Sequence, residues 1–343
     1  MPPVPARRGP IMTDVARLAG VSHQTVSRVL NDHPNVKATT RDRVLTAIDA
    51  LAYRRNFSAR ALVTRRTQTL GVVALDTTLY GPTSTLFGVE RAARDAGYFV
   101  SIVSLRTISR HAVREAIDYL ARQSVDGLVV IAPQRPAAEG LVDLHLDVPV
   151  VAVEGGSAPD LPVVCVDQEA GAAVTTRHLL DLGHSTVWHV AGPPDWLEAE
   201  GRVHGWRSTL EAAGAAVPDL LRGNWSPLSG YEAGQVLARR HDVTAVFVAN
   251  DQMALGVLRA LREAGVDVPG DISVAGFDDV PEAAFFAPPL TTVRQDFAEV
   301  GRRSIEVLVG QLDAAGGGDL ERPRIVVPAE LIVRSSTASP ESR

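Results

Sequence analysis

The stretch TDVARLAGVSHQTVSRVLND, residues 13–32, decides the fold of the N-terminal part of the chain. Thr13 is placed to cap a short helix that ends at Gly20, and Ser22 is placed to cap a second helix. A short helix, a glycine turn and a second helix form a helix-turn-helix, whose second helix can lie in the DNA major groove. The alternative is a plain helical hairpin inside a core. Apolar residues recur at helical spacing and are expected to be buried: Val15, Ala16, Ala19, Val26, Val29 and Leu30.

A third helix and a linker follow this stretch. Residues 40–53, TRDRVLTAIDALAY, predict a helix capped by Thr40. Its core face is expected to consist of Val44, Leu45, Ile48 and Leu51. Residues 54–69 are too short to form a stable isolated helix, so we expect a hinge that orders only when something holds it.

The charges of the chain are distributed unevenly. Residues 1–66 hold 12 Lys and Arg against 4 Asp, a net charge of +8, whereas the whole chain has −6. A basic head on an acidic body is the distribution expected of a nucleic-acid-binding module joined to a domain that binds something else. A solvated charged face is the alternative, but it does not explain why the basic surplus coincides with the helix-turn-helix.

Beyond residue 67 the pattern predicts an α/β body. Apolar strand-like runs such as residues 70–75 and 126–133 alternate with amphipathic helical stretches, which is typical of parallel sheets covered by helices. A second series of strands and helices follows, so we expect two similar lobes. A ligand would bind at the carboxyl ends of the strands, in the cleft between the lobes.

Several function classes lack their sequence signals. No apolar run is long enough to cross a bilayer, and residues 1–10 have no signal-peptide core, so we expect a cytoplasmic protein without membrane contact. The one cysteine, Cys165, excludes an intramolecular disulfide and is expected in a buried strand. The chain has no GxSxG or GxGxxG, its single lysine is Lys37, and its nine histidines lack metal-ligand spacing. We therefore expect neither an enzyme nor a metal site nor a cofactor.

The chain from Ile11 to about Arg334 resembles the lac repressor family of bacterial regulators. The resemblance is carried by residues 13–32, 56–62 (NFSARAL), 191–206 (AGPP…RVHGW), 224–230 (NWSPLSG), 248–256 (VANDQMALG), 271–279 (DISVAGFDD) and 290–297 (LTTVRQDF). It implies a homodimer whose two headpieces bind a pseudo-palindromic operator, and a body similar to periplasmic sugar-binding proteins.

The domain division implied by this resemblance has three parts. They are a helix-turn-helix headpiece at 11–55, a hinge helix at 56–66, and an effector-binding and dimerisation domain at 67–337. In the third part, the N-lobe is expected at about 67–165 and 296–326, and the C-lobe at about 166–293 and 328–337. The tail SSTASPESR lacks leucine heptads, which favours a dimer over a tetramer.

The resemblance also assigns residues to DNA. His23, Gln24 and Arg28 fall on base-contacting positions, where Gln suits adenine and Arg suits guanine. His23 replaces the tyrosine of the family's namesake, so the same operator is not assumed. Further contacts to phosphates or base edges are expected from Thr13, Ser22, Thr25, Ser27 and Asn31. In the hinge, Leu62 matches a leucine inserted into the minor groove, with Asn56 and Ala59 beside it, although Leu62 could instead pack against the body.

The effector pocket implied by the resemblance suits a sugar. Its expected residues are Arg202, Trp225, Asn250, Asp278, Gln295 and Phe297, with Glu154 where the namesake has a shorter acid. Carboxylate, amide and guanidinium groups bind adjacent hydroxyls, and an indole covers an apolar sugar face. Leu75 and Ile131 replace polar pocket residues, and Asp76 and Tyr80 are expected to compensate. Taken alone, Asp278 could be a turn cap and Trp225 a packed loop residue.

The predicted function is a repressor that releases DNA when a sugar binds, with a galactoside or another mono- or oligosaccharide as the effector. Within the family the rival is a regulator that needs its ligand, such as a purine, to bind DNA. A purine site would need aromatic rings on both faces of the base. A solute-binding protein would need an export signal and no basic head, which is the reverse of this sequence.

Overall fold

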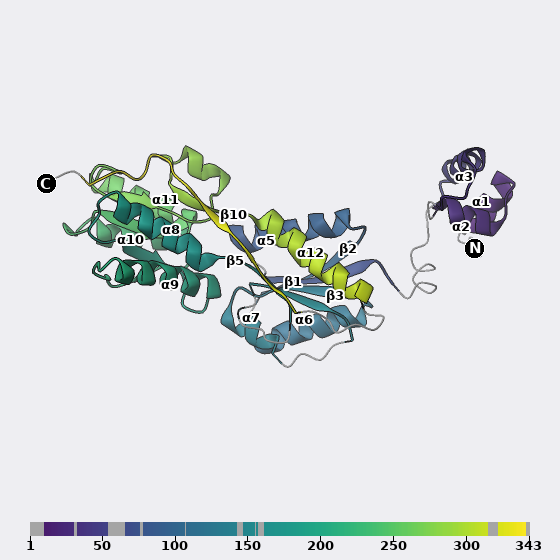
Figure 1. Cartoon of the computed structure of the whole chain (residues 1–343), viewed down its shortest axis with the longest axis horizontal. Helices are drawn as coiled ribbons and strands as arrows, with labels where there is room; N and C mark the ends of the chain where they lie inside the picture. The colour runs from purple at the N-terminus through teal and green to yellow at the C-terminus, as the bar shows by residue number, and fades with distance from the viewer. Residues whose placement is uncertain are drawn as a thin grey trace, which may run out of the picture. The chain divides into compact units, whose positions relative to one another are not determined.

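The computed structural model divides the chain into two compact units, residues 1–67, the headpiece, and residues 68–343, the body (Figure 1). The structure describes residues 10–30, 33–53, 66–75, 78–106, 108–142, 147–154, 156, 161–314 and 322–340.

Three helices close a small core in the headpiece: α1 (Met12–Ala19), α2 (His23–Leu30) and α3 (Ala38–Ala50). Gly20 ends α1 with a φ of 64°, a left-handed conformation that glycine adopts without strain. The Ser22 hydroxyl accepts a hydrogen bond from the Thr25 amide at 3.2 Å and so caps α2. Val26 and Val44 are fully or almost fully buried, together with residues of α1. The predicted helix-turn-helix is confirmed.

Two predicted helix caps and one core residue of the headpiece are wrong. The helix α1 begins at Met12, and the Asp14 carboxylate accepts the Ile11 amide at 3.0 Å, so Thr13 lies inside the helix. The helix α3 begins at Ala38, so Thr40 also lies inside. Leu45 is 46% exposed, because the buried stripe of α3 runs instead through Val44 and Ala47, three residues apart.

The N-lobe of the body is built on a six-stranded parallel sheet of order β11-β5-β4-β3-β1-β2. Its strands are β1 (Thr69–Leu75), β2 (Phe99–Leu105), β3 (Gly127–Ile131), β4 (Val150–Val153), β5 (Val163–Val166) and β11 (Arg324–Val327). Its helices are α5 (Tyr80–Asp95), α6 (Arg110–Arg122), α7 (Arg135–Gly140) and α12 (Phe297–Ala314).

Alternate residues of the strands β1, β3, β4 and β5 enter two different cores. Leu70 and Val72 pack with α5 and α12 on one face of the sheet, while Val73 packs with α6 and α7 on the other. Cys165 is buried in β5 on this second side, as predicted. The apolar runs are continuous because helices cover both faces of a parallel sheet.

The C-lobe repeats this architecture on a four-stranded parallel sheet of order β7-β6-β8-β9. Its strands are β6 (Trp188–Ala191), β7 (Leu221–Arg222), β8 (Ala245–Val248) and β9 (Ser273–Ala275). Its helices are α8 (Gln168–Asp181), α9 (Leu197–Ala212), α10 (Pro227–Leu237), α11 (Asp251–Glu263) and the 3-10 turn η1 (Pro281–Phe285). Helices α8 and α9 cover one face, and α10 and α11 the other. The predicted two-lobed α/β body is confirmed.

The chain passes between the lobes near Asp167, Asp296 and Pro328. An antiparallel pair, β10 (Thr292–Gln295) and β12 (Ala329–Ile332), packs on the C-lobe beside the second and third of these passages. In Figure 1 the yellow C-terminal segment runs along the body from the N-lobe to the C-lobe. The first passage leads directly into Gln168 and the second follows Gln295, and these two side chains form part of the candidate site.

Candidate functional site

The exposed face of α2 carries three long polar side chains. His23, Gln24 and Arg28 are exposed, whereas Val26 and Val29 on the opposite face are buried. Among the described residues, the side chain of Arg28 has no hydrogen bond or ion pair. The guanidinium and the amide are therefore available to a ligand, and a helix that presents such groups can contact base edges in a major groove.

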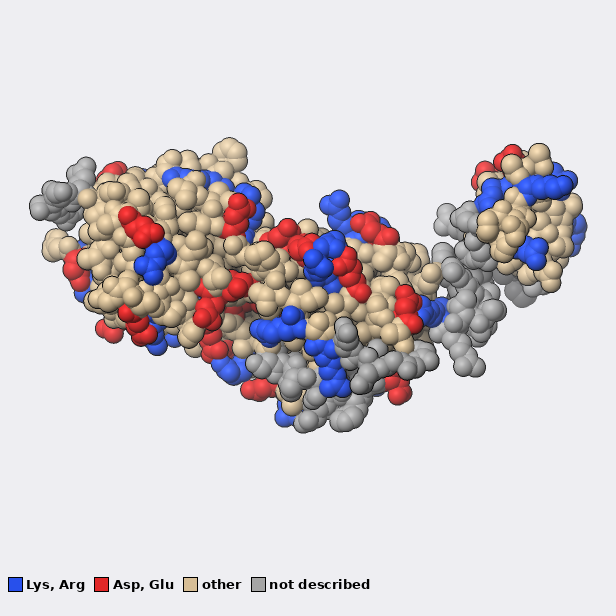
Figure 2. All heavy atoms as spheres, viewed as in Figure 1, with Lys and Arg blue, Asp and Glu red and all other residues tan. Residues whose placement is uncertain are grey.

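The structure describes only some of the other residues assigned to DNA. Thr13 is exposed on α1, and Ser22, Thr25 and Ser27 are exposed or half-buried around the start of α2. Asn31, Asn56, Ala59 and Leu62 lie outside the described residues. Figure 2 shows blue Lys and Arg side chains gathered on the visible face of the headpiece, while red and blue alternate on the body. The headpiece thus shows the cationic surface that binding to phosphates requires.

A narrow cleft opens in the body and is lined by residues of both lobes. Five predicted residues line it: Arg202, Trp225, Asn250, Asp278 and Gln295. Tyr80, predicted as a compensating residue, lines it as well. These six predicted residues come from six different elements or the loops beside them, so the fold alone brings them together.

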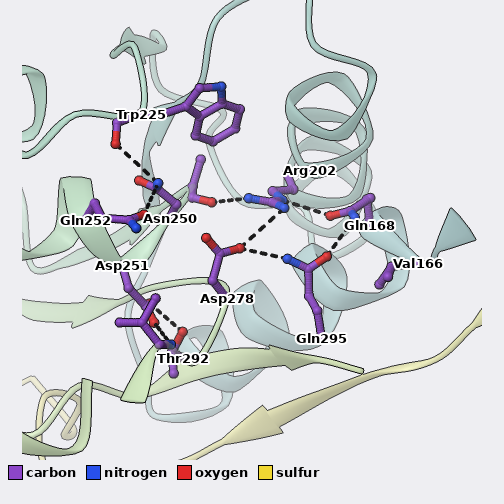
Figure 3. Close-up of polar contacts among 12 residues, drawn as sticks. Val166, Gln168, Arg202, Trp225, Asn250, Asp251, Gln252, Asp278, Thr292 and Gln295 are labelled. Carbon is purple, nitrogen blue, oxygen red and sulfur yellow. Dashed lines mark hydrogen bonds and ion pairs between the residues drawn. The ribbon is translucent and has the colours of Figure 1, made fainter. Parts of the chain in front are cut away.

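Arg202 lies at the centre of the cleft and is only 2% exposed. Its Nε donates to Gln168 Oε1 at 2.9 Å, one Nη donates to the carbonyl of Ala249, and the other Nη lies 3.7 Å from Asp278 Oδ1 (Figure 3). The guanidinium carbon lies 3.9 Å from the centre of the Phe277 ring. A guanidinium has five N–H donors in a fixed plane, so this one keeps donors for a ligand while its orientation is held.

Asp278 and two glutamines extend this network. Gln295 Nε2 donates to Asp278 Oδ1 at 2.7 Å, and Gln168 Nε2 donates to Gln295 Oε1 at 2.9 Å (Figure 3). Burial raises the pKa of Asp278 to about 6, although Arg202 and the Gln295 amide both favour its carboxylate form. The four side chains form one closed polar cluster in which each orients the next.

Asn250 both lines the cleft and begins α11. Its Oδ1 accepts the Met253 amide at 3.0 Å, and its Nδ2 donates to the carbonyl of Trp225 and to Gln252 Oε1 at 3.3 and 2.6 Å. Both amide hydrogens are thereby used, which leaves one lone pair of Oδ1 for a ligand. Asn250 is thus a helix cap that also positions the loop of Trp225.

Aromatic rings form part of the walls of the cleft. Trp225 meets Trp196 edge to face, with ring centres 5.5 Å apart and planes at 73°. Tyr80 meets Phe297 in the same manner at 5.8 Å. Phe297 is not among the residues that line the cleft, so it supports Tyr80 from behind.

Of the two remaining predicted pocket residues, one does not line the cleft and the other is not described. Glu154 follows β4 and accepts the Val166 amide at 2.8 Å, but it does not line the cleft. Burial and then the charge of Glu198 raise the pKa of Glu154 to about 8. Asp76 lies outside the described residues.

The sequence interpretation missed several lining residues: Leu79, Gly81, Pro82, Trp196 and Glu198. Trp196 and Glu198 follow β6 at its carboxyl end, in the same loop-to-helix position as Asn250 after β8. The rule that ligands bind at carboxyl ends of strands could have found them.

The comparisons with known proteins agree with this architecture. The family profile described as "Bacterial regulatory proteins, lacI family" matches residues 11–56, and that of "Periplasmic binding protein-like domain" matches residues 176–337. The lactose operon repressor of Escherichia coli (strain K12) is 32% identical over 334 residues, which are 96% of this chain and 91% of the relative. The chain belongs to the lacI family.

Three further similar proteins are informative. The PurR transcriptional repressor of Haemophilus influenzae (strain ATCC 51907 / DSM 11121 / KW20 / Rd) is 32% identical over 332 residues, covering 95% of this chain and 98% of PurR. A solved complex of the transcriptional regulator CelR with cellobiose has a TM-score of 0.70 and 32% identity, covering 95% of this chain and 99% of CelR. The solved lac repressor dimer with operator and the anti-inducer ONPF has a TM-score of 0.83 at 30% identity, covering 96% of this chain and all of that one.

The relatives bear these names of transcriptional regulators and not of enzymes. Within the described ranges, no helix is both long and apolar enough to span a membrane. In the same ranges, no three His, Cys, Asp or Glu side chains gather in a way that could hold a metal ion.

Proposed function

We propose that this lacI-family regulator is a repressor that binds a pseudo-palindromic operator as a homodimer and releases it when a small sugar enters the cleft. The lac repressor dimer solved on its operator, which this chain matches over 96% of its length, supports the first half. The convergence of Arg202, Asp278 and Gln295 in one cleft supports the second. We also infer that it acts in the cytoplasm and catalyses no reaction, since the relatives are named as transcriptional regulators.

DNA binding is assigned to the headpiece, residues 11–55, with a hinge at 56–66. Gln24 would pair with adenine and Arg28 with guanine, while His23 would contact a neighbouring base. Contacts that position the helix without specifying bases would come from Thr13, Ser22, Thr25, Ser27 and Asn31. In the hinge, Asn56, Ala59 and Leu62 would enter the minor groove. Dimerisation and effector binding belong to residues 67–337.

A sugar suits the cleft because the planar polar groups of the cleft are held in place and part of the cleft wall is aromatic. The guanidinium of Arg202, held by Gln168 and Ala249, presents its remaining N–H groups in one direction. Hydroxyls on neighbouring ring carbons can accept from it and donate to Asp278, and an indole face can cover the C–H side of the ring. A relative solved with cellobiose supports a ligand of this class.

A purine co-repressor is the second candidate, since PurR proteins are related to this chain as closely as the lactose operon repressor is. The aromatic geometry favours a sugar over a purine. Trp225 and Trp196 meet at 73°, so they do not present two parallel faces between which a flat base could stack.

The test is a thermal-shift screen of the full chain against neutral sugars and purine bases, followed by operator-binding measurements with each hit. A bound ligand raises the melting temperature by mass action. We expect a mono- or disaccharide to stabilise the body and to lower operator affinity. A protein that binds operator only after a purine is added would overturn the proposal in favour of the co-repressor.

Arg202→Ala provides the residue-level test. This change should leave operator affinity without ligand near that of the wild type, because Arg202 is outside the headpiece. The sugar concentration needed for release should rise tenfold for every ~1.4 kcal/mol of binding lost. An unchanged release concentration in a folded, dimeric variant would remove Arg202 from the site.

A further inference from the structure

Glu198 is a charged residue of the cleft with no assigned role. It lies in the first turn of α9 and lines the cleft together with Arg202 and Asp278. Within the described part of the chain, its side chain has no hydrogen bond and no ion pair. Among the described charges, Arg202 favours its ionised form, while Asp278 and Glu154 are repelled by it.

Backbone hydrogen bonds join the first turn of α9, which carries Glu198, to the N-lobe. The Leu197 amide donates to the carbonyl of Pro133 at 2.8 Å, and the Arg135 amide donates to the carbonyl of Asp195 at 2.9 Å. Arg135 is in addition ion-paired with Glu200. The backbone of this turn is therefore held against the N-lobe, which keeps the Glu198 side chain beside the cleft.

The positive charge in the cleft is already paired with groups of the protein. Arg202 donates to Gln168 and Ala249 and lies beside Asp278, which it roughly neutralises. Arg135 is engaged by Glu200. Among the described lining residues, one cation thus faces two carboxyl groups, so the ionised cleft has an excess negative charge that resides on Glu198.

We propose that Glu198 makes this cleft select uncharged effectors that donate hydrogen bonds, and reject ligands with a phosphate or carboxylate group. A carboxylate accepts hydrogen bonds from neighbouring hydroxyls of a neutral sugar. The same carboxylate repels an anion at short range, where partial burial reduces screening by water. This inference rests on the proposed effector role of the cleft and narrows the class of ligand that the cleft takes.

The test compares neutral and anionic partners of the same ligand on the full chain at pH 8, by titration calorimetry. The probes are glucose with glucose 6-phosphate, and cellobiose and lactose each with its aldonic acid. In the wild type we expect each anion to bind at least tenfold more weakly than its neutral partner. Glu198→Gln should reduce this ratio about tenfold, a change of ~1.4 kcal/mol. Glu211→Gln, an exposed position on the same helix, should leave the ratio unchanged.

Two results would overturn the inference: an anion that binds the wild type as tightly as its neutral partner, or a ratio that Glu198→Gln leaves unchanged. Operator affinity without ligand serves as the folding control for both variants. If a purine base binds and no sugar does, the sugar proposal fails, and the charge rule is then tested with that base and its nucleoside monophosphate.

Discussion

Asp278→Asn is expected to make the unliganded body more stable, although it removes half of a buried ion pair. The side chain is 7% exposed, accepts from Gln295 at 2.7 Å and lies 3.7 Å from Arg202. Asparagine has the same shape, and its Oδ1 can keep both contacts. The substitution therefore removes the charge with little change in packing.

The magnitude follows from the pKa of this carboxyl. Burial raises the pKa of Asp278 from 3.8 to about 6, even with Arg202 alongside. A shift of about two units corresponds to about 3 kcal/mol of unfolding free energy that the ionised carboxylate costs the folded state. We expect Asp278→Asn to recover about this amount at pH 8. Loss of one partner of a buried ion pair usually lowers the free energy of unfolding by about 3–5 kcal/mol, because the other charge is left unpaired. A gain in stability would show that the desolvation of Asp278 outweighs its pairing with Arg202, and a loss would show the reverse.

The pH dependence gives a second signature. With its raised pKa, Asp278 binds its proton more tightly in the folded than in the unfolded chain. The wild type therefore loses stability relative to the variant as pH rises from about 4 to about 6, and the difference is constant above that. Below pH 4 both states are protonated, and the two proteins should be equally stable with respect to this group.

Urea unfolding followed by tryptophan fluorescence measures this difference. All four tryptophans lie beyond residue 67, so the signal reports on the body alone. A variant that is less stable than the wild type at pH 8, or one whose gain is the same at pH 4, would refute the reasoning. The same variant should require at least tenfold more sugar to release operator, because it lacks the carboxylate that accepts hydrogen bonds from the sugar hydroxyls. Such a residue is retained for function although its charge lowers the stability of the fold.

The remaining predictions concern the DNA-binding segments and one helix contact. Arg28→Ala should lose about 1–3 kcal/mol of preference at one base pair of each half-site with nearly the same salt slope; selection from random DNA would contradict this if the preference persisted. Amide exchange at 56–63, around Leu62, should slow only when operator is bound, and equal protection in both states would exclude an ordered hinge helix in the complex alone. Gly301→Ala should destabilise the body by about 1–3 kcal/mol, because its Cβ would lie 2.2 Å from the backbone of Gly88, whereas Gly310→Ala on the same helix meets nothing within 4 Å and should not destabilise it. Equal urea midpoints for these two glycine variants would contradict that prediction.

The fold could be predicted because each element carries its own periodicity. The strand runs of the body are continuous and apolar, and α1 and α2 show a clear buried stripe. Helix ends are harder to predict. Thr13 and Thr40 are good caps by residue type, but the helices begin one to two residues before them. Leu45 fits the helical spacing of Ile48 and Leu51, but the buried stripe is centred on Val44 and Ala47, which leaves Leu45 exposed.

The candidate site was predictable where it depends on strand ends or family motifs. Asn250 and Asp278 follow β8 and β9 directly, so the position of the strands predicts where they lie. Trp196 and Glu198 follow β6, so the same rule points to their loop, but their place in the cleft also depends on backbone contacts of the first turn of α9 with the other lobe, at residues 133–135. Such pairing joins segments some 60 residues apart and leaves no periodic signal in the sequence.

The polar network of the cleft contains residues of two of the three segments that join the lobes. Gln168 begins α8 just after the first passage, Gln295 ends β10 just before the second, and the two amides are hydrogen-bonded to each other. Gln168 also accepts from Arg202, and Gln295 donates to Asp278. A ligand acts on a conformational equilibrium only through different affinities for its states. Because these C-lobe residues lie beside the lobe connections while Tyr80 lines the cleft from the N-lobe, a ligand that contacts both sides would favour one angle between the lobes. This arrangement gives the effector a physical means of favouring one lobe angle, with the 1–3 kcal/mol typical of allosteric coupling.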